Sequence, residues 1–306
     1  MSRRGWALFI TMSLIWGVPY LLIKVAVGGI SPASLVFLRT GIAALLLVPL
    51  ALARGQLRPV LRRWPIVLAF AFVEMAVPWL LLGSAERRLS SSLAGLLIAA
   101  VPLVGALLGW ATGGERLGPR RLLGLLVGIA GVAALVGLDL HVDDALALVE
   151  MVVVIVGYAV GPFLLARYLS DLPGLGVTAA SLAFTAIGYA PVAAVQLPRH
   201  WPAGKVVASV AVLALLCTAT AFLVFFALIA EVGPVRATVI TYLNPAVAVT
   251  LGVLLLHESF TVGIAVGFVL VLAGSVLATR RSVPPAAVAA DGAAGPVEVP
   301  EPTAAS

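Results

Sequence analysis

The sequence predicts an all-α integral membrane protein, with ten transmembrane helices arranged as two inverted five-helix repeats. Three observations lead to this fold class. The 306 residues are 62% hydrophobic and only 10% charged, whereas a soluble domain has about 25% charged residues. Long apolar stretches follow one another, separated by turns or charged segments, and the mean hydropathy is +1.16. Residues of the first half also recur in the second half at one constant offset.

The internal repeat is visible when the numbering is shifted by 143. Seven pairs of similar or identical residues then coincide: Pro19 and Pro162, Lys24 and Arg167, Ala94 and Ala237, Pro102 and Pro245, Glu115 and Glu258, Gly124 and Gly267, Gly131 and Gly274. Because proline and glycine constrain the shape of the backbone, we expect both halves to share one fold. The first repeat covers residues 6–137 and the second covers residues 147–279.

Five apolar stretches of the first half are long enough for a transmembrane helix, which needs about 20 residues. They are residues 6–28, 32–53, 65–85, 90–111 and 121–137. The breaks are a Gly-Gly turn, two charged segments and a glycine-rich segment. The apolar stretch that follows Met1 is longer than a signal-peptide core and has no cleavage site, so we expect it to remain as the first helix.

Five further stretches complete the set in the second half. They are residues 147–168, 174–197, 206–230, 234–256 and 261–279. Without water, backbone groups must bond within their own segment, so all ten should be helices. Residues 280–306 are rich in Pro, Ala and Gly without periodicity, which predicts a disordered cytoplasmic tail.

Arginine and lysine predict the orientation. With the N-terminus in the cytoplasm, the inner segments hold thirteen of these residues and the outer segments hold four. This excess predicts a multi-pass protein of the plasma membrane with both termini in the cytoplasm. Because each half has an odd number of spans, the second half enters from the opposite face. In inverted repeats of this kind the substrate site is typically near the middle of the membrane.

Composition and motifs argue against several other classes of protein. The net charge of +6 comes from arginines beside apolar runs, so we expect a lipid bilayer as partner and no nucleic acid. The lone Cys217 excludes an internal disulfide, and the three histidines are too scattered for a metal site. No catalytic or ATP-binding motif is present. We therefore expect no enzyme activity, no cofactor and no metal.

Several motifs together resemble the EamA family of the drug/metabolite transporter superfamily. The first stretch carries Trp16-Gly17 and Lys24, and the second carries Phe37-Leu38-Arg39. Each half then has a small-residue helix start, a proline within the helix, a glutamate and a glycine-rich helix; these are Ser92-Leu93-Ala94, Pro102, Glu115, Gly124 and Gly131, then Ala237, Tyr242-Leu243-Asn244-Pro245, Glu258, Gly267 and Gly274. Two positions depart from the pattern: Pro19 replaces a small polar residue, and Ala159-Val160 replaces a second Trp-Gly pair.

The resemblance implies a secondary active transporter that exports a small organic metabolite or drug, driven by an ion or substrate gradient. An importer of the same fold is one alternative, because gradients set the direction. A scaffold or enzyme within the membrane is another, for which Glu74 with Arg39 is the candidate pair.

Glu74 is the main candidate for the ion pathway. It lies about ten residues from either end of its stretch, near the centre of the bilayer, where a lone carboxylate costs ~2.5–3.5 kcal/mol. Such a group can carry a coupling proton or form a polar contact between helices. Arg39 can pair with Glu74 or bind an anionic group of the substrate, and a structural ion pair is the alternative.

Other polar or aromatic residues within the spans are candidates for the substrate pathway: Trp16, Tyr20, Tyr158, Tyr242 and Asn244. Trp16 and Tyr20 are four residues apart and share a helix face, where they can stack on a substrate or pack against a neighbouring helix. Pro102 and Pro245 remove a backbone donor at equivalent places and are candidate hinges or fixed kinks.

Some residues have a simpler structural reading. We expect Lys24 and Arg167 to reach the lipid headgroups. We expect Glu115 and Glu258 to organise a helix–helix turn, for example by accepting N–H groups at the start of the next helix. Gly124-xxx-Gly128 and Gly263-xxx-Gly267 allow close helix contact, either in a homodimer or between the two halves.

Overall fold

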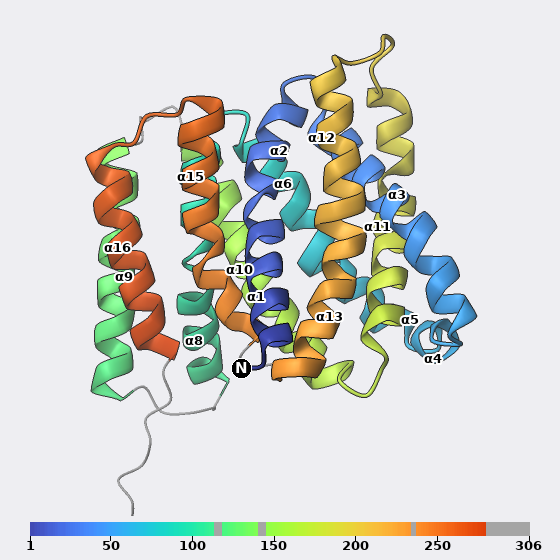
Figure 1. Cartoon of the computed structure of the whole chain (residues 1–306), viewed down its shortest axis with the longest axis horizontal. Helices are drawn as coiled ribbons and strands as arrows, with labels where there is room; N and C mark the ends of the chain where they lie inside the picture. Colours follow the sequence, from blue (N-terminus) through green and yellow to red (C-terminus); the bar gives the residue numbers. More distant parts are fainter. Residues whose placement is uncertain (113–117, 140–144, 234–236, 280–306) are drawn as a thin grey trace, which may run out of the picture.

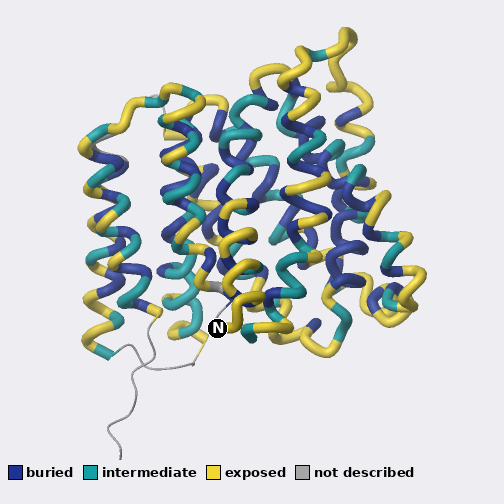
Figure 2. Tube along the Cα trace, in the orientation of Figure 1, coloured by how far each residue is buried: buried dark blue, intermediate teal, exposed yellow. Residues whose placement is uncertain are grey.

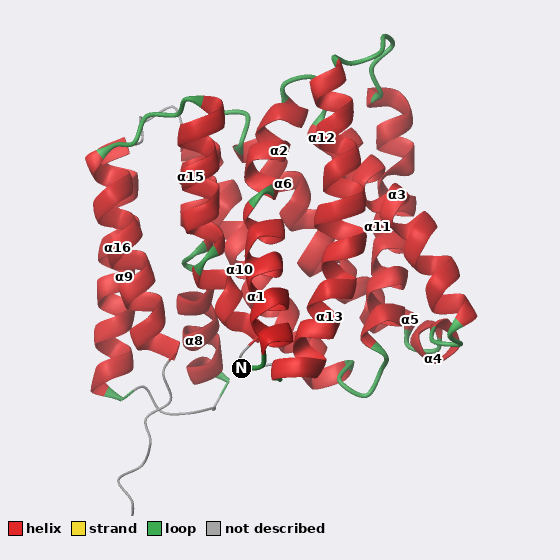
Figure 3. Cartoon of the chain, viewed as in Figure 1, coloured by secondary structure: helices red, strands yellow, loops and turns green. Residues whose placement is uncertain are grey.

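The computed structural model describes residues 1–112, 118–139, 145–233 and 237–279, and every regular element in these ranges is a helix (Figure 3). Within these ranges, nine helical segments are long and apolar enough to cross a membrane: Arg3–Val27, Pro32–Ala53, Trp64–Ala85, Ser91–Ala111, Ala145–Tyr168, Gly174–Gln196, Gly204–Val232, Val239–Leu256 and Val262–Thr279. Their number and length identify a multi-pass membrane protein.

The elements follow the predicted order. The first half contains α1 (Arg3–Gly17), α2 (Pro19–Val27), α3 (Pro32–Ala53), α4 (Leu57–Leu61), α5 (Trp64–Ala71), the π-helix η1 (Phe72–Ala76), α6 (Val77–Ala85), α7 (Ser91–Ile98), α8 (Val101–Ala111) and α9 (Pro119–Asp139). The second half contains α10 (Ala145–Tyr168), α11 (Gly174–Gln196), α12 (Gly204–Ala214), the π-helix η3 (Leu215–Thr220), α13 (Ala221–Val232), the 3-10 helix η4 (Thr238–Tyr242), α15 (Asn244–Leu256) and α16 (Val262–Thr279).

The predicted stretch 121–137 forms α9, although α9 is not among the nine segments above. It packs along α16 and exposes Leu122, Leu126 and Ile129 on its outer face. Apolar side chains such as Leu45 and Val195 are exposed on other outer faces too, while the interior is buried (Figure 2). Soluble proteins rarely expose apolar surface of this extent. The predictions for Glu115 and for the tail 280–306 lie outside the described residues.

Serines and prolines define the starts of several helices. Ser31 accepts a hydrogen bond from the backbone N–H of Ser34 (3.1 Å), and Pro32 occupies the first helical position of α3. Ser90 caps α7 in the same way, through the N–H of Leu93 (3.1 Å). These side chains satisfy donors that a helix start leaves without a partner.

Pro102 and Pro245 interrupt their membrane segments at equivalent places. α7 ends at Ile98 and α8 begins just before Pro102, while η4 ends just before α15, which carries Pro245 in its first turn. The first break frees the carbonyl of Ala99, which accepts a hydrogen bond from the Ser275 hydroxyl (2.8 Å). The predicted interruptions are therefore present; their role as hinges stays a prediction.

The two halves meet through equivalent elements. The most extensive contacts join α9 to α16 and α3 to α11, and α9 and α16 lie side by side at one edge of the molecule (Figure 1). A Cβ on Gly124 would lie 2.8 Å from the carbonyl oxygen of Gly274, and one on Gly131 would lie 2.7 Å from the backbone nitrogen of Val271. The glycines thus bring the two halves together, while a homodimer through another face stays a prediction.

Glu258 also joins the halves, from the segment between α15 and α16. Its carboxylate accepts hydrogen bonds from the backbone N–H groups of Ser91 (2.7 Å) and Ser92 (2.9 Å) and from the Ser92 hydroxyl (2.5 Å). Glu258 therefore accepts N–H groups at a helix start, as predicted, but the prediction of which helix is wrong. The helix is α7 of the opposite half, rather than the next helix in the chain, and its positive N-terminus favours the anion.

Candidate functional site

Arg39 is the charged group at the centre of a buried polar cluster. It lies on α3 and is 8% exposed. Its Nε donates a hydrogen bond to the Thr218 hydroxyl on η3 (2.8 Å), and its guanidinium carbon lies 3.8 Å from the centre of the Trp79 ring on α6. The cation–π contact and the hydrogen bond partly replace the water that Arg39 loses on burial.

The π-helix geometry places Thr218. The Thr218 hydroxyl donates to the carbonyl of Leu213, five residues earlier (2.8 Å), and still has lone pairs that accept from Arg39. η1 occupies the equivalent place in the first half, because Phe72 corresponds to Leu215 at the offset of 143. π-helical turns of this kind occur frequently at functional sites.

Two predicted pathway residues, Tyr158 and Tyr20, belong to the cluster. Tyr158 on α10 lies close enough to Arg39 for its charge to act on the tyrosine, and the same holds for Tyr20. Tyr20 on α2 is buried against α7, where a Cβ on Gly95 would lie 3.3 Å from its ring. The cluster therefore draws on both halves of the chain.

The two terminal nitrogens of Arg39 are left for another acceptor. Among the described residues, Nε is the Arg39 nitrogen that donates a hydrogen bond, and no carboxylate lies within 4.0 Å of the guanidinium. A planar guanidinium held on a ring, with both outer nitrogens unused, matches the geometry of a carboxylate or phosphate. The site can therefore bind an anionic group.

The predicted pairing of Glu74 with Arg39 is wrong. Glu74 lies in η1 and packs against Gly161 of α10, where a Cβ would overlap its carboxylate. Its Oε2 is buried and has no hydrogen-bond partner among the described residues. Arg39 instead bonds to Thr218 of the opposite half and lies over the ring of Trp79 in its own half.

Three other predicted pathway residues lie apart from the cluster. Trp16 packs against Phe225 (4.8 Å between ring centres) and Phe222 (6.1 Å) of α13, so helix packing is the reading that the structure supports. The Tyr242 hydroxyl bonds to that of Thr279 on α16 (2.6 Å). The Asn244 side-chain amide is oriented so that its nitrogen donates to the backbone carbonyl oxygens of Ser13 (3.2 Å) and Ile240 (3.0 Å).

Lys24 differs from its prediction, and Glu86 was overlooked. Lys24 donates to the carbonyl oxygens of Glu86 (2.6 Å) and Leu89 (2.7 Å), instead of reaching the headgroups. Glu86 follows α6 directly and is fully buried. Its place before Arg87 and Arg88 is typical of a solvated turn, so no sequence pattern indicates that Glu86 is buried. Within the described residues no group of His, Cys, Asp or Glu could hold a metal.

Comparison with known proteins adds independent findings. The model of the EamA-like transporter family matches residues 3–137 and again residues 145–280. A protein of Bacillus subtilis (strain 168), named "Uncharacterized transporter YvbV", is 25% identical over 278 residues, covering 88% of this chain and 89% of that protein. A protein of Streptantibioticus cattleyicolor, named "Probable terminal-alkyne amino-acid exporter", is 28% identical over 291 residues, covering 92% of this chain and 95% of that protein.

A solved crystal structure, named "Crystal structure of protein", is similar in fold. Its TM-score is 0.65 and its identity 24%, covering 90% of this chain and 96% of that one. This likeness concerns the fold alone.

Proposed function

Because the chain belongs to the EamA-like transporter family, we propose that it is a secondary active transporter that exports a small organic metabolite across the plasma membrane. α9 supplies the tenth span in this proposal, and the two repeats are inverted with respect to each other. The N-terminus and the end of α16 lie at the same end of the bundle (Figure 1). With the excess of arginine in the same segments, this supports cytoplasmic termini.

The observation that carries the proposal is the Arg39 site. A buried guanidinium with two free nitrogens, held between elements of both halves, is suited to a carboxylate group of the substrate. Amino acids carry such a group, and one relative is named an amino-acid exporter. Tyr20 and Tyr158 then border the bound molecule, and the Pro102 and Pro245 breaks let the repeats rock between inward and outward openings.

Proton coupling is assigned to Glu74 in this proposal. A half-buried carboxylate whose Oε2 has no hydrogen-bond partner in the described part of the chain, in a π-helical turn near the middle of its segment, can take up a proton on one side and release it on the other. The equivalent residue in the second half is Cys217, so the coupling site occurs once.

Substitution of Arg39 tests the proposal. In the purified protein, amino-acid binding is measured by thermal shift and transport by uptake into proteoliposomes. Arg39→Gln is expected to weaken binding by about ten-fold or more, because a hydrogen bond to a charged group contributes about 1.5–3 kcal/mol. Arg39→Lys keeps the charge but loses the planar pair of donors, so it should restore binding only in part.

Arg63→Gln is the matched control. Arg63 forms an exposed ion pair with Asp171 through two contacts of 2.8 Å and is not part of the Arg39 cluster. This variant should keep the affinity of the unmodified chain. Unchanged carboxylate binding in Arg39→Gln would exclude Arg39 as the anion site.

A further inference from the structure

A second unpaired carboxyl group lies at the end of the bundle opposite the N-terminus. Glu86 follows the last residue of α6 and has no exposed surface. Neither of its carboxylate oxygens has a hydrogen-bond partner among the described residues. A buried ionised carboxylate without partners is very costly, so this arrangement favours a bound proton.

Lys24 lies next to Glu86 but bonds to its backbone. The Lys24 ammonium donates to the carbonyl oxygens of Glu86 (2.6 Å) and Leu89 (2.7 Å), two of the acceptors left over where α6 ends. No ion pair within 4.0 Å joins it to the Glu86 carboxylate in the described residues. An ammonium has three N–H donors, so Lys24 keeps one for a further acceptor.

The other ionisable groups that act on Glu86 come from four parts of the chain. They are Tyr20 on α2, Arg39 on α3, Tyr158 on α10 and Glu258 before α16. Burial raises the pKa of Glu86 well above its usual range, Lys24 opposes this rise, and Glu258 adds to it. Glu258 accepts three hydrogen bonds at the start of α7.

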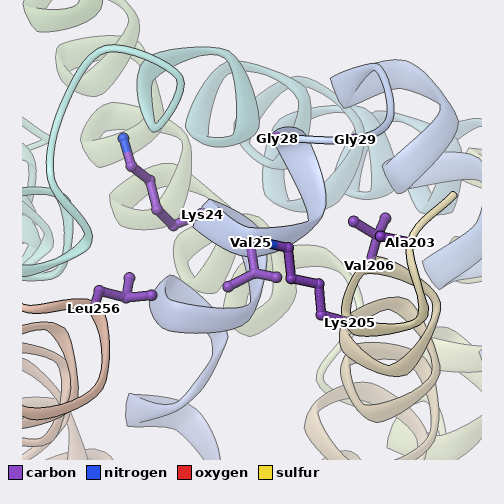
Figure 4. Close-up of a pocket in the computed structure, with 8 residues that line it drawn as sticks. All are labelled: Lys24, Val25, Gly28, Gly29, Ala203, Lys205, Val206 and Leu256. Carbon is purple, nitrogen blue, oxygen red and sulfur yellow. The ribbon is translucent and has the colours of Figure 1, made fainter.

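A surface cavity lies beside Lys24. The cavity has a volume of about 320 Å³ and lies among the end of α2, the start of α12 and the end of α15. Its lining includes Lys24, Gly28, Gly29, Lys205 and Leu256. Figure 4 shows the Lys24 side chain pointing away from Lys205. Lys24 therefore borders the cavity and contacts the backbone of Glu86 at once.

We propose that Glu86 is a proton-binding site of the transporter, with Lys24 as the neighbouring cation. When Glu86 gives its proton to water, Lys24 leaves the carbonyls of Glu86 and Leu89 and pairs with the new carboxylate. The inference deepens the proposed transport function and rests on it. A metal ion fits less well, because it needs several oxygen ligands and Glu86 supplies one carboxylate.

The test is the pH dependence of thermal unfolding of the full chain in lipid nanodiscs, from about pH 5 to about pH 8. A carboxyl whose folded pKa is raised contributes stability that is fully present below its unfolded pKa and is lost as pH rises through its folded pKa. The melting temperature should therefore fall with rising pH, and Glu86→Gln should remove part of that fall.

Two lysine variants give a readout that a structural role alone would not change. Lys24→Gln removes the opposing charge, so the loss of stability should shift to higher pH. Lys205→Gln, from the same cavity, should leave the titration where it is. The two lysine variants test the proposed proton site even if Glu86→Gln does not fold.

Three results would overturn the proposal: the same pH slope in Glu86→Gln as in the unmodified chain, an unmoved titration in Lys24→Gln, or a pH slope that appears in sodium buffer and vanishes in choline buffer. No substrate is present in this measurement. Loss of transport with an intact titration would therefore count against the transport proposal and not against the proton site.

Discussion

The position of the Glu74 carboxylate depends on the shape of its neighbour. Gly161 leaves the space that the carboxylate fills, and a Cβ at position 161 would lie 2.8 Å from the Glu74 Cδ. No described residue donates a hydrogen bond to Oε2. A carboxyl in such a place is easier to keep neutral than charged, which agrees with the coupling role proposed for it.

Glu74→Gln should therefore fold and bind substrate but lose transport driven by a pH gradient. Proteoliposome uptake with and without the gradient measures this, and the variant should fall to the level seen without a gradient. Cys217→Ala, at the equivalent place in the second half, is the matched control and should keep gradient-driven transport. Uptake by Glu74→Gln that still follows the pH gradient would exclude Glu74 as the coupling residue.

Single residues were harder to predict than segments. Arg39 and Glu74 were identified from their place within apolar stretches, but sequence spacing does not say which helices face each other. Arg39 therefore met Thr218 and Trp79 instead of Glu74. Glu86 is hidden by long-range folding, because α2 covers it from a distant part of the chain.

Elements were predictable because the apolar stretches and their breaks are local features. The structure adds details that depend on long-range contacts. These are the π-helices η1 and η3 within the third segment of each half, and the interruption between α1 and α2. The close contact of α9 with α16 depends on glycines that are visible in the sequence. The sequence alone left open whether these glycines bring the two halves of one chain together or form a homodimer contact.

Gly274→Ala tests this contact. A Cβ on Gly274 would lie 2.6 Å from the carbonyl oxygen of Gly124, and backbone cannot give way as a side chain can. We expect a loss of roughly 1–3 kcal/mol in the free energy of unfolding, the usual cost of overpacking. A denaturation series in detergent measures it.

Gly109→Ala on α8 is the control, since a Cβ there meets nothing within 4 Å. It should be neutral, or stabilising by about 0.5–1 kcal/mol through helix propensity. Equal stabilities of the two variants would show that α9 and α16 do not pack as described.

The whole molecule follows the plan of two similar halves, with the orientation still a prediction. The native chain suits a labelling test because Cys217, its lone cysteine, is 1% exposed. Trp201→Cys lies in the segment between α11 and α12, and Arg58→Cys lies on α4.

In intact cells, an impermeant thiol reagent should label Trp201→Cys, and it should label Arg58→Cys only after the membrane is opened. Labelling is read as a mass shift, with the unmodified chain as the unlabelled control. The reverse order of labelling would place the N-terminus outside the cell.

The glycine contact between the halves has a consequence for how many ligands one chain holds. The residues that set backbone shape occur in both halves, as Gly124 with Gly267 and Gly131 with Gly274. The ionisable residues of the proposed sites do not: Arg39, Glu74 and Glu86 correspond to Leu182, Cys217 and Ile229. A symmetric frame with an asymmetric interior offers one binding site rather than two, so we expect a stoichiometry of one anion per chain, bound in a single orientation.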